Sequence, residues 1–202
     1  MSTAAFDQHV RFWESKSKKG ESYVGRIGED HLLQKKAIES LLMTRLKTTD
    51  FFTDGLDFGC GYGRFVPFLS NFCGHLWAVD IVPDIVERVR GVAPTVSALK
   101  VSHPIILPFK GGRIDFVWAC LVFQHLVAPE FFSAACQEIR RVTKPGARMI
   151  VIDNAVDKAP HVSPRGPEVL TRELGFRPGW YADKITINKR PQDHWLIDGV
   201  KA

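Results

Sequence analysis

The chain has 202 residues, of which 45% are hydrophobic and 24% are charged, a balance typical of a soluble globular protein with one sizeable core. Its longest apolar run, residues 116–123, is far too short to cross a bilayer, so no membrane span is expected. The net charge of +5 permits an acidic partner such as RNA, but the basic residues are scattered and not interleaved with aromatic ones, which favours a generally basic, solvated surface.

The amino-terminal residues and the cysteines suggest a compartment. Residues 1–13 contain no basic region followed by an apolar core, so we expect no secretory signal and a cytoplasmic protein. The four cysteines, Cys60, Cys73, Cys120 and Cys136, are widely spaced, without a CxxC pair or a Cys/His cluster. This pattern favours reduced, buried thiols over disulfides, and no metal site is expected.

Two helices are predicted before residue 50. Phe6, Val10 and Trp13 recur at helical spacing and predict a short amphipathic helix over residues 6–15. Residues 16–28 are polar and punctuated by glycine, which predicts a loop. Asp30 is expected to cap the next helix. The apolar face of that helix is predicted to consist of Leu33, Ala37, Ile38, Leu41, Leu42 and Leu46.

A glycine-rich turn, residues 56–64 (LDFGCGYGR), separates an apolar strand from a helix. Gly59, Gly61 and Gly63 let the backbone approach a ligand where a side chain would collide. Such a turn before a helix binds nucleotide-like ligands. In the dinucleotide fingerprint the third glycine comes one position later, so the spacing argues against a nicotinamide cofactor.

Two acids end the first two predicted strands. Asp57 lies where a pyrophosphate would otherwise bind, and a carboxylate there repels phosphate and attracts an ammonium group. Asp80 follows Gly59 by 21 positions, close to the interval of about 20 at which an acid binds ribose hydroxyls. The ligand is therefore predicted to be a nucleoside that carries an amino-acid end.

The rest of the chain alternates strands and helices. Strands are predicted at residues 75–80, 99–101, 114–118 and 149–152, with a final pair at 185–187 and 195–197. Helices are predicted at residues 65–72 ending at Gly74, at 83–89 ending at Gly91, from Pro129 until Pro145-Gly146 breaks the helix, and at 169–174, the last after an irregular stretch from 153 to 167. This alternation indicates right-handed crossovers and a doubly wound sheet.

Five ordered segments resemble the class I S-adenosylmethionine-dependent methyltransferases of the small-molecule type. They are the glycine-rich turn, Leu107-Pro108-Phe109, Ile114-Asp115-Phe116-Val117, Gln124-His125-Leu126 and Lys144-Pro145-Gly146. The resemblance implies an α/β fold, a Rossmann-like doubly wound seven-stranded sheet with order 3-2-1-4-5-7-6, strand 7 antiparallel and helices on both faces. It also implies a single domain over residues 1–202. Residues 1–50 would form an amino-terminal helical lid, 51–155 the cofactor-binding core, and 156–202 the substrate-side loop and final strand pair.

The same resemblance implies S-adenosyl-L-methionine as cofactor and S-adenosyl-L-homocysteine as product. The expected cofactor contacts are Asp57, Gly59, Cys60, Gly61, Gly63, Asp80, Ile81, His103, Cys120 and Arg26. His103 departs from the family, which commonly has an acid there for the adenine amino group. Its ring nitrogen could accept that hydrogen bond, or it is a surface loop histidine. Arg26 would bind a carboxylate through its fork of donors.

Methyl transfer from a sulfonium is an in-line displacement that needs alignment more than activation. A general base is required only if the acceptor holds a proton, and His125, followed by His161, is then the candidate. Gln124, Arg165, Trp13 and Tyr23 are the expected substrate contacts. For each of these residues, packing or solvation is the alternative.

The acceptor is the least determined feature. After the fourth strand the chain reads Ala119-Cys120-Leu121-Val122, whereas methyltransferases of exocyclic base amines usually carry an Asn/Asp-Pro-Pro-aromatic motif. We therefore expect a small-molecule O, N or C acceptor and a monomer or homodimer. Two alternatives stay open: methylation of RNA such as tRNA, which the basic charge supports, and cofactor binding without catalysis.

Overall fold

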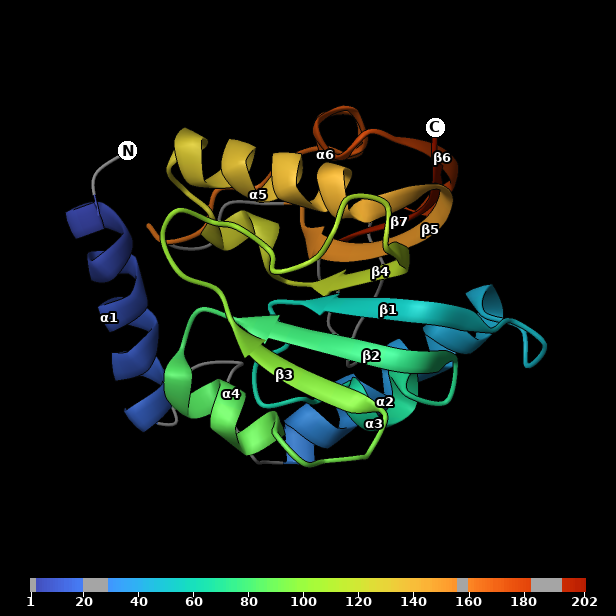
Figure 1. Cartoon of the computed structure of the whole chain (residues 1–202), viewed down its shortest axis with the longest axis horizontal. Coiled ribbons are helices and arrows are strands. Elements are labelled where there is room, and N and C mark those ends of the chain that lie inside the picture. Colours follow the sequence, from blue (N-terminus) through green and yellow to red (C-terminus); the bar gives the residue numbers. More distant parts are fainter. Residues whose placement is uncertain (1–2, 20–28, 156–159, 183–193) are drawn as a thin grey trace.

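A seven-stranded sheet forms the centre of the molecule (Figure 1). The computed structural model describes residues 3–19, 29–155, 160–182 and 194–202. The strands are β1 (Phe52–Phe58), β2 (Cys73–Asp80), β3 (Val96–Lys100), β4 (Ile114–Cys120), β5 (Thr143–Asn154), β6 (Phe176–Ala182) and β7 (His194–Lys201). Their order is β3-β2-β1-β4-β5-β7-β6, and β7 runs antiparallel to both of its neighbours. The predicted fold class and strand order are confirmed.

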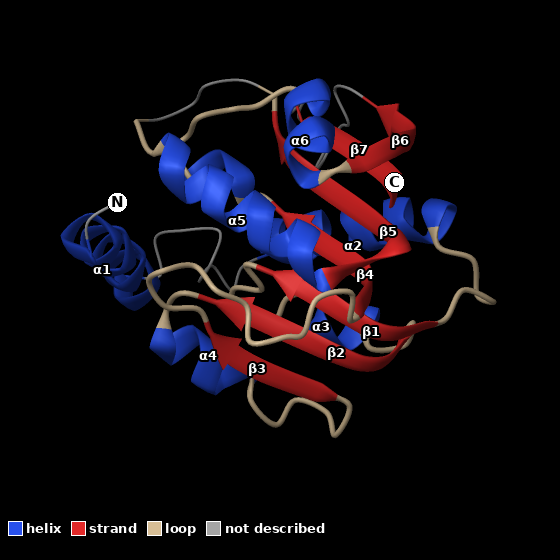
Figure 2. Cartoon of the chain, turned by 45° about the horizontal axis from the view of Figure 1, so that its top comes forward, coloured by secondary structure: helices blue, strands red, loops and turns tan. Residues whose placement is uncertain are grey.

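Helices cover both faces of the sheet (Figure 2). One face packs against α2 (Glu29–Arg45), α3 (Val66–Leu69) and α4 (Pro83–Val89), and the other packs against α5 (Pro129–Val142) and α6 (Pro167–Leu174). Along β4, Phe116 and Trp118 belong to the core on the face covered by α2, α3 and α4. Val117 and Ala119 belong to the core on the face covered by α5 and α6. Because successive strand residues point to opposite faces, a strand buried on both sides must be apolar throughout.

The helix α5 forms as its sequence predicts. Pro129 occupies the first turn, where its missing N–H needs no partner. The buried residues Phe131, Phe132, Ala135, Cys136, Ile139 and Val142 recur at helical spacing. Arg140 and Arg141 lie in the last turn, where they meet the negative end of the helix dipole.

The two amino-terminal helices differ from the prediction at their ends. The helix α1 covers Thr3–Lys19, so residues 16–19 continue the helix instead of beginning a loop. The remainder of that predicted loop, residues 20–28, lies outside the described residues. The helix α2 begins at Glu29, which places Asp30 inside the first turn rather than at the cap.

The apolar face predicted for α2 is only partly correct. Ile38, Leu42 and Leu46 are completely buried against the sheet. Leu33 is 52% exposed, because the apolar stripe runs at intervals of four residues and position 33 lies beside it.

The helix predicted over residues 65–72 is much shorter than expected. Only α3 is helical, since the chain already joins the sheet at Phe72, whose carbonyl accepts a hydrogen bond from Phe52 N at 2.8 Å. Gly74, predicted to end the helix, lies within β2. The strand β3 likewise begins three residues earlier than predicted, at Val96.

The final strand pair was half predicted. The strand β7 contains the predicted residues 195–197, and its partner is β6, which follows α6 directly. Residues 185–187 lie outside the described residues. Pro178 disguised β6, since proline disfavours strands except at edges and bulges; β6 is an edge strand with a register shift between Pro178 and Trp180.

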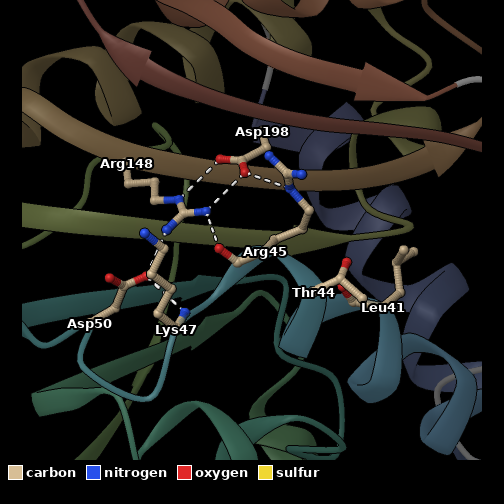
Figure 3. A network of polar contacts seen from close by, with 7 residues as sticks. All are labelled: Leu41, Thr44, Arg45, Lys47, Asp50, Arg148 and Asp198. Atoms are coloured by element: carbon tan, nitrogen blue, oxygen red, sulfur yellow. Dashed lines mark hydrogen bonds and ion pairs between the residues drawn. The ribbon is translucent and has the colours of Figure 1, made fainter.

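An ion-pair network ties α2 to the sheet (Figure 3). Arg148 of β5 donates from Nε to Asp198 Oδ1 at 3.0 Å and from a terminal nitrogen to Asp198 Oδ2 at 2.9 Å. Arg45, at the end of α2, donates to Asp198 Oδ2 at 3.0 Å. Arg148 also pairs with Asp50 at 2.9 Å. Asp198 is buried, so two guanidinium groups compensate the cost of removing its charge from water.

The variant Asp198→Asn should lower the free energy of unfolding by about 2 to 3 kcal/mol, because it leaves two arginines without their shared partner. Urea denaturation measures this loss. The matched control is Glu87→Gln, whose ion pair with Arg90 is more than 60% exposed on both sides and should contribute less than about 0.5 kcal/mol. Equal losses in the two variants would contradict a structural role for this network.

Candidate functional site

The carboxyl ends of β1, β2 and β4 point toward α1, which crosses this edge of the sheet in both views (Figures 1 and 2). Open parallel sheets bind ligands outside the carboxyl ends of their strands. The glycine-rich turn, Asp80 and the loop after β4 all lie at this edge. The candidate site is therefore built from these segments and covered by α1.

The glycine-rich turn requires its glycines. Gly59, Gly61 and Gly63 have φ values of 73°, 52° and 72°, a region that side chains disfavour. A Cβ on Gly59 would lie 2.5 Å from a methyl carbon of Val122, in the loop after β4. Gly59 N and Cys60 N both donate to the carbonyl of Val79, at 2.9 and 3.0 Å. The turn is thus fixed between β2 and the β4 loop.

Asp80 is oriented by backbone N–H groups. Its Oδ2 accepts from Gly61 N at 3.1 Å, and its Oδ1 accepts from Val82 N at 3.0 Å. Burial raises the pKa of this carboxyl, and these hydrogen bonds oppose the rise. A carboxylate has about four lone-pair sites, so Asp80 retains acceptor capacity for the hydroxyls of a ribose.

Asp57 is the unusual group of the site. It is 2% exposed, and its Oδ2 has no hydrogen-bond partner among the described residues. Burial, followed by the charge of Asp80, raises the pKa of Asp57 to about 8, although the Arg64 guanidinium opposes this shift. A buried carboxyl without a donor costs folding free energy, so its presence indicates a ligand that supplies a donor.

Arg64 follows the last glycine of the turn and reaches toward α2 and β4. It donates to Gln34 Oε1 at 2.8 Å and to Cys120 Sγ at 3.7 Å. Its guanidinium carbon lies 4.5 Å from the ring centroid of Phe65. Burial raises the pKa of the Cys120 thiol to about 12 and that of the Cys60 thiol well above its usual range, so both thiols are uncharged.

The helix α1 contacts three segments at this edge: the loop after β3, the loop after β4 and the glycine-rich turn. Its Phe6 ring lies 5.7 Å from the ring of His103, and its Trp13 ring lies 4.5 Å from the ring of His125. Near its end, Ser17 hydrogen bonds to the hydroxyl of Tyr62 in the glycine-rich turn. The helix therefore spans from the loop after β3 to the turn after β1.

A hydrogen-bond chain fixes the loop after β4, which contains the short helix η1 (Phe123–His125). Gln124 is buried, and its Oε1 accepts from Asn154 N at 2.9 Å. Its amide nitrogen must then donate to His125 Nε2, 3.0 Å away, so the proton of His125 is on Nδ1 and is donated to the carbonyl of His161 at 3.0 Å. Burial lowers the pKa of His125 to about 4, which keeps the ring neutral.

A family model described as a methyltransferase domain matches residues 56–151. The "Probable tocopherol O-methyltransferase, chloroplastic" of Oryza sativa subsp. japonica is 30% identical over 104 residues, 48% of this chain and 28% of that protein. The uncharacterized methyltransferase YodH of Bacillus subtilis is 27% identical over 109 residues, 51% of this chain and 44% of that protein. The chain thus spans less than half the length of these two curated relatives.

The N-methyltransferase NodS of Bradyrhizobium japonicum, in complex with S-adenosyl-l-homocysteine, has a similar fold, with a TM-score of 0.65 at 17% identity over 87% of this chain and 89% of that one. These matches agree with the resemblance to the class I S-adenosylmethionine-dependent methyltransferases that the sequence predicted. The predicted resemblance is confirmed.

The residues of this candidate site fit S-adenosylmethionine. The unpaired oxygen of Asp57 matches the ammonium of its amino-acid end, and the remaining lone pairs of Asp80 match ribose hydroxyls. The positive φ values of Gly59, Gly61 and Gly63 favour glycine, and glycine has no side chain to block a ligand's approach to the backbone. Ile81 is partly buried against the core beside Asp80.

His103 also lies at this edge of the sheet, where its ring contacts Phe6 of α1. Its Nδ1 is buried without a hydrogen-bond partner among the described residues, so an acceptor or donor position is open there. Tyr23, a predicted substrate contact, and Arg26, a predicted cofactor contact, lie outside the described residues.

Arg165 is used differently from the prediction. Its guanidinium donates to the backbone carbonyls of Phe123 at 2.8 Å, Ser163 at 3.1 Å and Leu126 at 2.7 Å, and lies over the ring of Phe132. These contacts give Arg165 the role of holding the loop after β4. They do not support a clamp for an anionic substrate.

Sequence reasoning missed several residues of the site. Gln34 is the polar member of the buried stripe Gln34-Ile38-Leu42-Leu46 on α2. A polar residue at an apolar position of an amphipathic helix was the available signal. Asp153, at the end of β5, accepts from Gln124 N at 2.9 Å, and its pKa is raised to about 7 by burial. Its position at a strand end was a signal, but its partner was not visible in the sequence.

Two negative findings concern the described residues alone. No helix among them is long and apolar enough to cross a membrane. Within the same part of the chain, no three His, Cys, Asp or Glu side chains come together in a group that could hold a metal ion.

The variant Asp57→Asn should change how stability depends on pH. Asp57 binds its proton more tightly in the folded protein, with a pKa of about 8, than at its ordinary value of 3.8. Its stabilising effect is therefore fully present below about pH 4 and is lost as the pH rises toward 8. The variant lacks this titration, so between pH 5 and pH 8 its free energy of unfolding should gain about 1 to 3 kcal/mol relative to the wild type. Urea denaturation across this range measures the difference. Parallel pH profiles would show that Asp57 is already ionised or already paired.

Proposed function

We propose that the chain transfers a methyl group from S-adenosylmethionine to an O, N or C atom of a small molecule. The carrying observation is the buried Asp57 carboxyl, whose Oδ2 has no donor among the described residues, near the end of β1 and beside the glycine-rich turn. The ammonium of the methyl donor would supply its missing partner. The match to a methyltransferase-domain model supports methyl transfer as the reaction class. Two of the similar proteins are named as an O-methyltransferase and an N-methyltransferase.

Each element of the site has a role in this proposal. Asp80 holds the ribose hydroxyls, and the glycine-rich turn lies along the nucleoside. The methyl donor supplies the leaving group, so the protein has to align the acceptor and exclude water. The helix α1, from Phe6 to Ser17, covers the strand ends and provides this exclusion, as the predicted lid segment would.

The contacts of His125 support a role in shaping the acceptor side rather than in proton transfer. Its Nδ1 proton is donated to the carbonyl of His161, and its Nε2 lone pair accepts from Gln124. A general base needs a free lone pair directed at the acceptor. The Trp13 ring packs against the same imidazole and His161 stacks on it at 5.6 Å, so these three rings would define the acceptor side.

A small acceptor is favoured over RNA by the position of α1. The helix packs along the edge where an acceptor must enter, whereas RNA methylation is supported by the net charge of +5 alone. Binding without catalysis remains the outcome if the donor binds and no acceptor is methylated.

The cofactor can be tested by thermal and chemical stabilisation. S-adenosylmethionine or S-adenosylhomocysteine at about 100 times its Kd should add about 2.7 kcal/mol to the free energy of unfolding, and NAD and ATP should add nothing. The variant Asp80→Ala should weaken donor binding by about 10- to 100-fold, because it removes a charged acceptor. Stabilisation by NAD alone would refute the proposal.

The acceptor class can be tested by supplying donor labelled at the methyl group together with metabolite fractions or RNA. Label should enter the small-molecule fractions. Label in RNA, together with binding that weakens steeply as salt is added, would replace the proposed acceptor by RNA.

The variant His125→Asn should reduce kcat by less than about 10-fold, since alignment rather than proton transfer is affected. Removal of a general base would instead cost about 100- to 10,000-fold and would abolish the acid limb of the pH profile. Steady-state kinetics with the identified acceptor from about pH 3 to pH 9, a range that includes the His125 pKa of about 4, separates these results. A loss in the larger range would make His125 the catalytic base.

A further inference from the structure

We propose that Arg64 binds the carboxylate of the methyl donor, so that Asp57 and Arg64 together recognise a zwitterionic amino-acid end. This inference rests on the proposed function and deepens it. It assigns to Arg64 the carboxylate contact that the sequence suggested for Arg26.

An acidic and a basic side chain, Asp57 and Arg64, lie at one edge of the sheet without pairing. Among the described residues, neither an ion pair nor a hydrogen bond joins Asp57 to Arg64. The Arg64 partners are a neutral amide and a thiol, not a carboxylate. Yet the guanidinium acts on both neighbours, since its charge opposes the rise in pKa of Asp57 and of Cys120. An ammonium and a carboxylate on one ligand would complete both groups.

Contacts within the protein fix the Arg64 side chain before any ligand binds. The side-chain oxygen Oε1 of Gln34 accepts from one terminal nitrogen of Arg64, and Cys120 Sγ accepts from the other. Gln34 is only 2% exposed. The ring of Phe65 lies against the guanidinium plane at 4.5 Å. A guanidinium has five N–H donors, so donors remain for a carboxylate. A side chain that is already ordered loses little entropy when a ligand binds.

The position of Arg64 in the fold also suits this role. Arg64 follows the glycine-rich turn directly, and Cys120 ends β4, the strand that pairs with β1 through Asp57 and Trp118. The guanidinium therefore lies near the strand end that carries Asp57. A nucleoside bound through Asp80 and the turn would present its amino-acid end to this region.

The test compares three ligands by calorimetry: S-adenosylmethionine, its decarboxylated analogue, and 5′-methylthioadenosine, which lacks the amino-acid end. Wild-type protein should bind S-adenosylmethionine about 10- to 100-fold more tightly than the decarboxylated analogue, the value of one charge-assisted hydrogen-bonded contact. In Arg64→Gln this ratio should fall to within about threefold, while the affinity for 5′-methylthioadenosine stays unchanged.

The matched control is Arg88→Gln. Arg88 is an exposed arginine whose guanidinium lies over the ring of Tyr62 in the same turn, so its removal lowers the charge nearby without touching Gln34 or Cys120. Arg88→Gln should keep the wild-type ratio. Binding of 5′-methylthioadenosine confirms that each variant is folded, and Arg64→Met replaces Arg64→Gln if the latter fails this check.

The outcomes are distinguishable. A wild-type ratio retained in Arg64→Gln or Arg64→Met overturns the role of Arg64 and leaves the proposed function standing. An equal loss of the ratio in Arg88→Gln also overturns it, since general electrostatics would then be the cause. A wild-type protein that binds none of the three ligands overturns both the inference and the proposed function.

Discussion

The site depends on one constraint, the buried Asp57 carboxyl near the end of β1, whose Oδ2 has no hydrogen-bond donor in the described part of the chain. The cost of this burial appears as a pKa of about 8. The sheet makes the burial unavoidable, because Asp57 pairs with Ala78 of β2 and Trp118 of β4 and cannot leave the interior without breaking both ladders. Asp80 and Gln124, by contrast, have partners: Asp80 accepts from two backbone N–H groups, and Gln124 has its own chain of hydrogen bonds. Among the described residues, the acid with an unpartnered buried oxygen thus lies where a cationic ligand is expected.

The two ends of α2 connect the site to the far end of the sheet. At its carboxyl end, Arg45 joins Arg148 and Asp198, and its buried stripe packs on the sheet. Near its other end, Gln34 continues this stripe and accepts from Arg64. A helix anchored in this way places the Gln34 carbonyl at a fixed point. The ion-pair network therefore contributes to the site through packing, without contacting it.

The sequence predicted the parts of the fold that follow from periodicity and punctuation. Most strands, α5 and the glycine-rich turn follow from apolar runs, helical spacing and three alternate glycines, all of which are local signals, whereas the strand order was implied only by the family resemblance. The length of α3 and the strand β6 could not be predicted, because Phe72 joins the sheet through a partner twenty residues away and Pro178 disguises an edge strand. In the site, Asp57 and Asp80 were recognisable from spacing. The roles of Arg165 and Gln124 depend on which carbonyls and N–H groups lie opposite them, and a linear pattern does not contain that information.

Charge balance explains why a site of this kind suits a sulfonium donor. Ionised Asp57 and Asp80 with Arg64 carry a net charge of −1, and the donor, with its sulfonium, ammonium and carboxylate, carries +1. The proposed complex is therefore neutral, which matters because an uncompensated charge is costly in a buried site.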